Sequence, residues 1–379
     1  MSKSYDIVVI GAGLSSLMFL SRYILKNKDQ SILLIEKSIK KNINQTFCIW
    51  QGPDLIDIKK IYNLKPRHVW RKIEVSYEND TICRDISPYS YECFDGKETL
   101  KELLNQCKNK ISIKQGLDVR KIKNNKGLIE VITKNITIKT KYLIDSRNKI
   151  SKEQYESPPS LQQAFVGNEI VSKNEQFDPE VIKLMNFSNN KKEVEFTYTL
   201  PFSKKSALVE TTFFSKRPSL IDIKKLQKKL LKRYTRIKLI KEERGIIPMI
   251  LDREFINNNN NIPIGLSAGM ARPSTGYSMM RIAQWVKSIE SKKIKQDNIN
   301  EFQFKPNKLL EWFDSIFLTV CYFWPQKVPN LFMKLFSNAD IKSIIRFMSD
   351  APTLSDIFLI ILSMPKKLMI HGLIKKYVK

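Results

Sequence analysis

Residues 6–16 read DIVVIGAGLSS and residues 31–36 read SILLIE, and these two stretches together decide the fold. The run at residues 6–10 is almost continuously apolar, which predicts a strand buried on both faces. The glycines that follow indicate a tight turn, and an amphipathic helix is expected from there to about residue 28. Strand, glycine turn, helix and second strand in this order predict a βαβ unit with a phosphate-binding turn.

This glycine turn supplies the first candidate binding residues. Gly11 permits the tight turn, and Gly13 lets the backbone approach a pyrophosphate at the helix N-terminus, where amides and the helix dipole favour anions. Leu14 is a further candidate contact, and Ser16 replaces the third glycine of the usual pattern. Glu36 ends the second strand, where an acidic side chain binds a ribose hydroxyl. We therefore predict a dinucleotide site rather than an accidental glycine turn.

A second cofactor segment is expected at residues 141–147, KYLIDSR. This short apolar strand ends in Asp145 and Arg147, where backbone and side chains can meet a cofactor. It follows an aromatic- and proline-bearing stretch at residues 44–103 without helical periodicity. Before residue 141, we also expect a helix at residues 97–108 and strands at residues 111–115, 128–133 and 136–139.

The stretch NIPIGLSAGMARPSTGYSMMRIAQWV at residues 261–286 predicts a second glycine-bounded turn. An apolar strand breaks at residues 265–269, and a helix is expected to open at about Gly276. Its N-terminal dipole can be aimed at a cofactor ring. The alternative is an ordinary loop. The candidate cofactor contacts here are Gly269, Ser274, Thr275, Gly276 and Tyr277.

Residues 206–214, SALVETTFF, predict a strand whose two faces are apolar or hydroxylic except for one carboxylate, Glu210. Desolvation raises the pKa of such a carboxyl, which can then remain protonated near neutral pH and act as an acid. The alternative is a solvated glutamate on an edge strand. Strands dominate residues 161–247, with one basic helix near residues 221–234, and we interpret this region as a substrate-side sheet.

Composition excludes several classes of protein. The 379 residues suffice for two domains, and a mean hydropathy of -0.30 is that of a soluble protein. The five cysteines lack a CxxC pair and accompany two histidines, which argues against a zinc site and for free thiols. The net charge of +27 is mostly scattered lysine, so it favours an anionic membrane surface over nucleic acid.

The tail from residue 307 carries short apolar runs at residues 316–324, 331–336 and 357–365. These runs are too short to span a bilayer, but lysine-flanked helices of this kind can dip into one leaflet. Core packing is the alternative. We find no signal peptide and no transmembrane run, and expect a peripheral protein on the cytoplasmic side of the membrane. The flanking lysines are Lys366, Lys367, Lys375 and Lys376.

Several segments together resemble the flavin-dependent lycopene cyclases of carotenoid synthesis. They are IGAGLSS, TFCIWQ, LIDSR, LQQAFVG, FDPEVIKLMNF, YTLPFSKKSALVETTFF, GIIPM and GMARPSTGYSMMRI. The last two long segments are specific, because general flavin hydroxylases carry a GD motif at the second helix start and this chain does not. The resemblance implies that Gly11, Gly13, Glu36 and residues 274–278 hold FAD, and that Glu210 is the acid/base. The family's tryptophan motif is filled loosely, by Thr46, Phe47 and Trp50.

The resemblance also implies an α/β fold, with a Rossmann-like FAD-binding domain of the glutathione-reductase and hydroxylase type, an inserted β-rich substrate domain and a helical C-terminal region. We expect the FAD-binding domain at residues 1–45, 105–160 and 262–300. The substrate-side region would comprise residues 46–104 and 161–261. The helical tail, which is the candidate membrane-contacting region, would comprise residues 301–379.

The implied reaction is a non-redox cyclisation that converts the linear ends of lycopene to β-ionone rings, giving β-carotene through γ-carotene. Reduced FAD would stabilise the carbocation, and NAD(P)H is a candidate reductant. The apolar carotenoid would be collected from a membrane, with no nucleic acid involved. The sequence does not decide between β and ε rings, between one and two cyclised ends, or among oligomeric states.

Two other functions remain open from the sequence. The first is an FAD-dependent monooxygenase or dehydrogenase that acts on an apolar substrate. The second is a non-enzymatic protein that uses its positive charge to bind a membrane surface or nucleic acid, and salt-sensitive binding without flavin would favour it.

Overall fold

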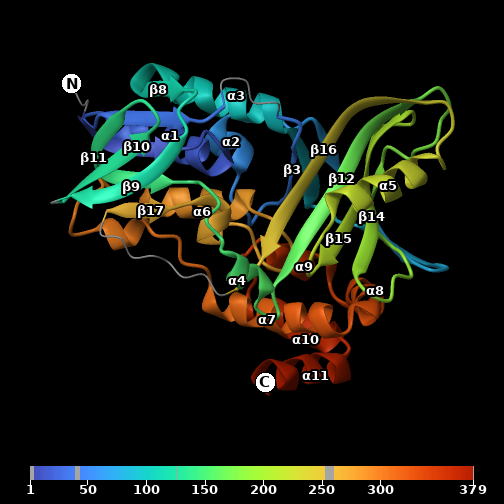
Figure 1. Ribbon diagram of the computed structural model, residues 1–379. Coiled ribbons are helices and arrows are strands. Elements are labelled where there is room, and N and C mark those ends of the chain that lie inside the picture. Colours follow the sequence, from blue (N-terminus) through green and yellow to red (C-terminus); the bar gives the residue numbers. More distant parts are fainter. Residues whose placement is uncertain (1–3, 39–42, 126, 252–259, 379) are drawn as a thin grey trace.

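The computed structural model describes residues 4–38, 43–125, 127–251 and 260–378. It contains a mixed sheet with helices beside it, a large second sheet, and a group of C-terminal helices beneath both (Figure 1). This is the α/β architecture that the sequence predicts.

The first sheet is built on the predicted βαβ unit. β1 (Ser4–Ile10) pairs in parallel with β2 (Ile32–Glu36) on one side and with β11 (Thr137–Asp145) on the other, and α1 (Leu14–Lys26) connects β1 to β2. The strand order is β8-β2-β1-β11-β10-β9, with β17 on β11. The remaining strands are β8 (Ser112–Gln115), β9 (Val119–Asn125), β10 (Leu128–Thr133) and β17 (Asn261–Pro263).

Two predictions for this sheet are corrected. The strands expected at residues 136–139 and 141–147 are one strand, β11, because Lys139 and Thr140 continue the pairing with β1 without interruption. β9 was not predicted. Its sequence VRKIKNN is mostly polar and exposed, as is common on the edge of a sheet, so it lacks a buried face from which to recognise it.

The second sheet has the order β16-β12-β15-β14-β13-β5-β6. β15 (Ser206–Ser215) is buried along nearly its whole length, as its two apolar faces predict. One face packs on α5 (Leu220–Leu231), through Ile223 and Leu231. The other strands are β5 (Lys72–Tyr77), β6 (Asp80–Asp85), β12 (Leu161–Ser172), β13 (Val181–Phe187), β14 (Val194–Ser203) and β16 (Ile237–Met249).

A small third sheet lies beside the others and has the order β3-β7-β4. The stretch at residues 44–103 was expected to lack helical periodicity before the helix at residues 97–108, but the structure places one short helix inside it, capped by the Asp57 side chain. Apart from β5 and β6 of the second sheet, the elements from residue 44 to residue 107 are β3 (Thr46–Gln51), α2 (Ile58–Tyr62), β4 (His68–Trp70), β7 (Ser90–Asp95) and α3 (Gly96–Cys107). A further short helix, α4 (Lys152–Glu156), follows β11.

The helix after the second glycine turn, α6 (Met279–Ile289), begins three residues later than expected. Gly276 has φ +73°, in the left-handed region that a right-handed helix does not include. Residues 274–278 therefore form an irregular turn before the helix, rather than its first turn.

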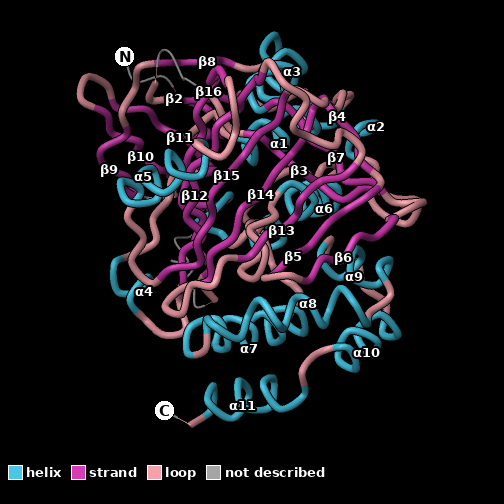
Figure 2. Tube along the Cα trace, turned by 90° about the vertical axis from the view of Figure 1, so that its right-hand side faces the viewer, coloured by secondary structure: helices cyan, strands magenta, loops and turns pink. Residues whose placement is uncertain are grey.

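Five helices form the C-terminal region, and they lie below the sheets in both views, with α11 outermost (Figure 2). Among the described residues, none of the helices is long and apolar enough to cross a membrane by itself. α10 and α11 pass that test only as a pair, and the chain bends by 106° between them. The helices are α7 (Lys308–Phe323), α8 (Val328–Asn338), α9 (Ile341–Met348), α10 (Leu354–Ser363) and α11 (Lys366–Tyr377).

Buried charges attach these helices to the turn at residues 274–278. Arg272 is fully buried and pairs with Asp314 of α7 at 3.0 Å and with Asp350 at 3.5 Å. Ser274 donates to the same Asp314 carboxylate at 2.8 Å. Because each buried charge has a partner, this cluster can fix the turn against α7 without leaving an uncompensated charge.

Candidate active site

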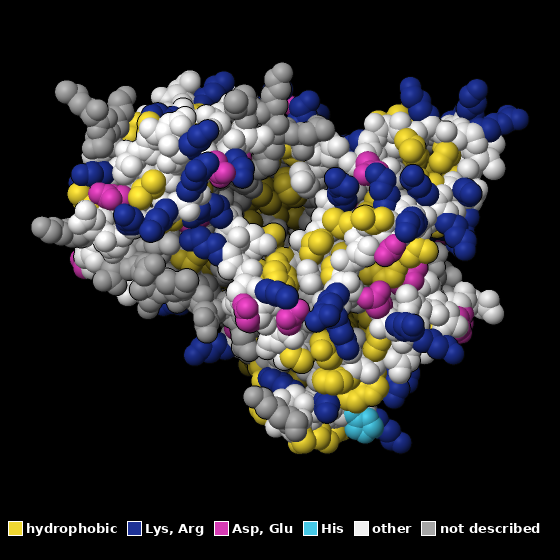
Figure 3. Space-filling view, in the orientation of Figure 1, with side chains coloured by type: hydrophobic (Ala, Val, Ile, Leu, Met, Phe, Trp, Pro, Cys, Tyr) yellow, Lys and Arg dark blue, Asp and Glu magenta, His cyan; other side chains and the backbone are white. Residues whose placement is uncertain are grey.

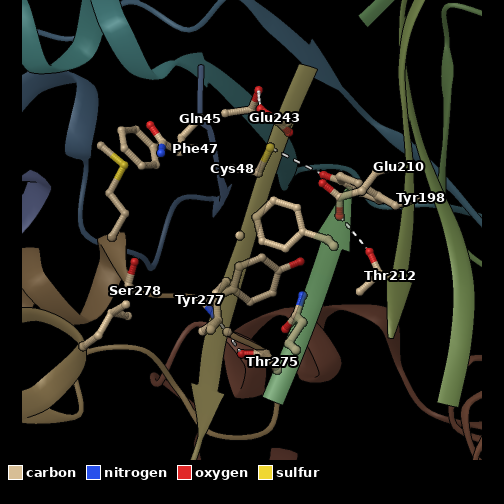
Figure 4. A pocket seen from close by; sticks show the side chains of 18 of the residues that line it. Gln45, Phe47, Cys48, Tyr198, Glu210, Thr212, Glu243, Thr275, Tyr277 and Ser278 are labelled. Carbon is tan, nitrogen blue, oxygen red and sulfur yellow. Dashed lines mark hydrogen bonds between the residues drawn. The ribbon is translucent and has the colours of Figure 1, made fainter. Parts of the chain in front are cut away.

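A cavity of about 500 Å³ lies where the two glycine turns of the first sheet approach the open face of the second sheet (Figure 4). Gly13 and Leu14 line it from the first turn, and residues 274–278 line it from the second. The opposite wall consists of side chains from β12, β14, β15 and β16. Candidate cofactor residues and the candidate acid thus face one space.

Four residues form a row across the second sheet. Tyr198 of β14 pairs with Glu210 of β15, Glu210 pairs with Gly167 of β12, and Gly167 pairs with Glu243 of β16. Register partners in adjacent strands lie on the same face, so the two carboxylates are on either side of a residue without a side chain. The structure therefore brings a second carboxylate, Glu243, to the site of Glu210.

Glu210 is buried on the face opposite α5, which excludes the solvated alternative, and its exposed fraction is 8%. Burial, followed by the nearby charge of Glu243, raises the pKa of Glu210 well above its ordinary value. A hydrogen bond that the Thr212 hydroxyl donates to Glu210 Oε1 at 2.7 Å opposes this rise only in part. The raised pKa favours the protonated form of Glu210, which is the form that can donate a proton.

Glu243 was not predicted from the sequence. Burial raises its pKa to about 7, against the lowering effects of the Thr46 hydrogen bond and the Lys241 charge. The Thr46 hydroxyl donates to Glu243 Oε2 at 2.8 Å, so the loosely matched tryptophan motif supplies a contact to this second carboxylate. Glu243 can therefore exist in both protonation states near neutral pH.

Aromatic side chains surround the carboxylates. The next row of the sheet on the same face contains Phe196, Thr212 and Phe165, and all three line the cavity. Phe47 and Tyr277 approach from the opposite side (Figure 4). Such π faces can stabilise a cation that forms between them.

Three tyrosines join the two walls of the cavity, with Tyr91 buried and Tyr198 and Tyr277 partly buried. The Tyr91 hydroxyl is 2.8 Å from that of Tyr198 and 3.3 Å from that of Tyr277. Trp50 packs edge-on against Tyr91, with ring centroids 4.6 Å apart. Trp50 of the tryptophan motif thus supports the tyrosines rather than lining the cavity itself.

The first glycine turn has the geometry of a pyrophosphate cradle. Gly11 has φ +90°, and a Cβ there would lie 2.3 Å from Ser146 Oγ. At Gly13, by contrast, no heavy atom of the described residues lies within 4 Å of a Cβ position. The Glu36 carboxylate accepts a hydrogen bond from the Ala12 backbone at 2.8 Å and so also supports the turn. The space beside Gly13 is therefore open for a ligand.

The second turn also fits a bound cofactor. The Gln163 Oε1 atom is buried in the wall of the cavity and has no hydrogen-bond partner among the described residues. It lies next to Gly276, where a Cβ would be 2.7 Å away. A buried acceptor without a partner is suited to a ligand that donates a hydrogen bond, and the absence of a Cβ at Gly276 allows the close approach of this turn to Gln163. The residues present thus fit a flavin dinucleotide at both turns.

Five of the candidate residues lie outside the lining of this cavity, as far as the structure describes it: Gly11 of the first turn, Glu36 at the end of β2, and Asp145, Arg147 and Gly269. Asp145 is buried, but ion pairs with Arg147 at 2.8 Å and Lys149 at 2.7 Å lower its pKa. Gly269 has a left-handed backbone conformation and ends a short 3-10 helix. Its carbonyl accepts a hydrogen bond from the Arg281 side chain. These residues support the backbone behind the two turns.

A family model described as lycopene cyclase protein matches residues 6–373, nearly the whole chain. The chain belongs to the lycopene cyclase protein family. The resemblance drawn from its motifs is thereby confirmed. A comparison with curated proteins found no match.

Solved structures with a similar fold are FAD-dependent enzymes and their relatives. A geranylgeranyl bacteriochlorophyll reductase-like protein from Thermoplasma acidophilum is 12% identical, with a TM-score of 0.71 over 98% of this chain and 99% of that chain. The anhydrotetracycline hydroxylase OxyS from Streptomyces rimosus is 11% identical, with a TM-score of 0.61 over 92% of this chain and 76% of that chain. The myxobacterial chondrochloren halogenase CndH, a variant of the FAD-dependent halogenases, is 10% identical, with a TM-score of 0.57 over 96% and 97%. These similarities confirm the expected fold of this lycopene cyclase family member.

Proposed function

We propose that this protein is a flavin-dependent lycopene cyclase, which closes the linear ends of lycopene into β-ionone rings without net redox change. The observation that carries the proposal is a buried carboxyl with a raised pKa, Glu210, facing a cavity that is also lined by aromatic side chains and by the two glycine turns. Family membership supports it. The reaction makes the protein an isomerase.

Glu210 begins the reaction by donating its proton to the terminal double bond of the polyene. A tertiary cation results, and an internal double bond attacks it to close a six-membered ring. The cation then moves into the ring and is quenched when a ring carbon loses a proton. Because one proton enters and one leaves, atoms and charge balance without an external oxidant.

Glu243 is suited to receive the departing proton. Its pKa of about 7 leaves it substantially ionised at neutral pH, whereas burial and the charge of Glu243 favour the protonated form of Glu210. Two neighbouring carboxyls with different pKa values can serve as acid and base in the same turnover. Proton exchange with solvent would then restore both groups.

FAD fits the two glycine turns, and in its reduced form it would supply electron density that stabilises the cation, with NAD(P)H as the proposed external reductant. Gly13 and Leu14 would contact the pyrophosphate side, and Gln163 and residues 274–278 the ring side. The aromatic rings of Phe165 and Phe196 add cation–π stabilisation near the carboxylates. The apolar walls exclude water, which would otherwise capture the cation.

The substrate dissolves only in membranes, so we propose peripheral contact with an anionic membrane on its cytoplasmic side. α10 and α11 carry the residues for this contact. In α10, Leu354 is 81% exposed and Phe358 is 60% exposed. Lys366 and Lys367 follow at the start of α11. Figure 3 shows apolar side chains and lysines together at the lower end of the molecule, where these helices lie. Apolar side chains beside lysines are the pattern of a surface that lies in the membrane interface.

Pigment chromatography tests the proposed function. The chain and its Glu210→Gln variant are expressed in a bacterium that accumulates lycopene, and the carotenes are separated. A ring-closed carotene with the native chain only supports both the cyclase and its acid. Cyclisation by both chains keeps the function and removes Glu210 from it.

Unchanged lycopene with the native chain, although the protein is folded and loaded with flavin, would contradict a cyclase. That result would favour an FAD-dependent monooxygenase or dehydrogenase that acts on an apolar substrate. Oxygen consumption and NAD(P)H oxidation in the presence of lycopene would then be the next assays.

A further inference from the structure

A second cavity, of about 350 Å³, lies among the C-terminal helices. Its lining comes from all five of them, α7 to α11, and is almost entirely apolar. Its lining includes Phe317, Leu331, Leu335, Phe336, Ile344 and Ile360. A polar ligand would lose its hydration there with few partners in return, so the lining selects a long hydrocarbon.

The second cavity adjoins the candidate active site. Ser274, Thr275, Phe332 and Met348 line both cavities, so the two cavities are neighbours that share the turn before α6 and one residue each of α8 and α9. The buried pair of Arg272 and Asp314 holds this turn against α7. The junction is thus a fixed part of the structure, built where the helices attach to the flavin turn.

The outer end of the second cavity reaches the proposed membrane-contacting surface. Ile361 of α10 and Ile370 of α11 line the cavity and are also 46% and 53% exposed. Lys366, at the start of α11, belongs to the same lining. Mostly apolar side chains therefore line the space between an exposed apolar surface and the candidate active site, and Ser274 and Thr275 are the polar residues of the shared lining.

We propose that the second cavity binds the part of the linear polyene that is not reacting, and that it is the route by which the polyene enters from the membrane. This inference rests on the proposed function. A conjugated polyene is stiff and cannot fold back on itself. When one end lies beside Glu210 and Glu243, the rest must continue in a nearly straight line, and the second cavity supplies a matching apolar space next to that end.

The chain-length dependence of cyclisation tests this inference. Ile344 is 1% exposed and lines the second cavity, whereas it does not line the first. Ile344→Trp would fill part of the second cavity and leave the carboxylates unchanged. Purified, flavin-loaded protein is assayed in detergent with lycopene and with a short polyene that has the same acyclic end but fits within the first cavity.

We expect the native chain to cyclise both polyenes. Ile344→Trp should cyclise the short polyene at the native rate and lycopene at least about tenfold more slowly, because a steric block of about 1.4 kcal/mol or more acts only on the long chain. Ile221→Trp is the matched control, since Ile221 is 73% exposed on α5, away from both cavities. It should leave both rates unchanged.

A second variant covers the case in which Ile344→Trp does not fold. Ile370→Trp, at the exposed mouth, should slow cyclisation of lycopene delivered in vesicles while the short polyene in detergent reacts normally. Equal effects of either variant on both polyenes, or no effect, would overturn the inference and leave the cyclase in place. Failure of the native chain to cyclise either polyene would instead remove the proposed function, and this inference with it.

Discussion

Glu210 and Glu243 extend over the same glycine from opposite sides. A Cβ on Gly167 would lie 3.3 Å from Glu210 Oε2 and 3.3 Å from Glu243 Cγ, so both side chains occupy the space above Gly167. Two carboxyls this close in a buried cavity cannot ionise independently. Burial and then the charge of Glu243 raise the pKa of Glu210 well above its ordinary value, and burial raises the pKa of Glu243 to about 7. The pair is therefore suited to share a proton.

Glu243→Gln should change the pH dependence of cyclisation. In the native chain, the rate should rise as Glu243 ionises near pH 7 and fall at higher pH, when Glu210 loses its proton. The variant lacks the base, and it also lacks the charge that raises the pKa of Glu210. The rise in rate near pH 7 should therefore disappear, and the fall in rate at higher pH should move to lower pH. We expect a rate loss at neutral pH of about 10²-fold. Initial rates across neutral pH, at equal flavin content, measure both effects, and an unchanged profile would contradict the paired roles.

The same substitution should change how stability depends on pH. The pKa of Glu243 is raised from 4.5 to about 7 on folding, so the folded chain binds more protons than the unfolded chain between these values. Its contribution to stability is therefore complete below pH 4.5 and is lost as the pH rises through about 7. Glu243→Gln should remove up to about 1.4 kcal/mol of slope per pH unit from the free energy of unfolding. Urea titrations of both chains at several pH values measure it, and parallel curves would count against a buried, proton-binding Glu243.

Gly167→Ala tests the space between the carboxylates. Gly167 lies in an ordinary strand, so alanine meets no backbone strain, but its methyl group would be tightly packed against both glutamates. We expect the unfolding free energy to change by about 1 kcal/mol and cyclisation to fall roughly 10- to 100-fold, because displaced reacting groups lose their alignment. Rates, flavin content and stability are compared with those of the native chain. A rate loss that merely follows a loss of folded protein would refute a specific role for this glycine.

Local sequence patterns predicted the parts of the site that depend on local chemistry. The strand, glycine turn and helix at the N-terminus lie within one short segment of sequence. The burial of β15 could be predicted because both of its faces are apolar. Glu210 stands out as the exception on that strand. The second turn was also recognised, although the left-handed Gly276 delays the helix that follows it.

Glu243 could not be found in this way. It lies in IKLIKEERGIIPM, where neighbouring lysine, glutamate and arginine give the appearance of a solvated edge strand, and β16 is indeed the edge strand of its sheet. Its burial comes from register: β12 sets it opposite Gly167, and Thr46 of a different sheet contacts it. Both partners are far away in the sequence. The second cavity was missed for the same reason, because it requires the packing of five helices.

The two glycines of the first turn should respond differently to alanine. At Gly13 a Cβ meets no heavy atom of the described residues within 4 Å, so Gly13→Ala should fold normally and lose affinity for flavin by about tenfold or more, since it fills the space of the ligand. Gly11→Ala should destabilise the apoprotein, because φ is +90° and Ser146 Oγ would lie 2.3 Å away. Thermal unfolding of apoprotein and flavin titration separate the two effects. A destabilised Gly13→Ala apoprotein with normal flavin affinity would contradict a pyrophosphate site at this turn.

Membrane contact through α10 and α11 should depend on where lysines lie and not only on the total charge. Each lysine near an anionic surface contributes about 1 kcal/mol, so reversing the four lysines of α11 should weaken binding to phosphatidylserine vesicles by well over tenfold. The matched control reverses four exposed lysines near α5, which changes the net charge equally on a surface away from the exposed leucines and isoleucines of the tail. Vesicle sedimentation measures both variants at several salt concentrations, and binding of the native chain should fall as salt rises. Equal losses in both variants would indicate that net charge alone causes binding, and would contradict a docking surface at the tail. The tail variant changes Lys366, Lys367, Lys375 and Lys376 to Glu, and the control changes Lys225, Lys228, Lys229 and Lys232 to Glu.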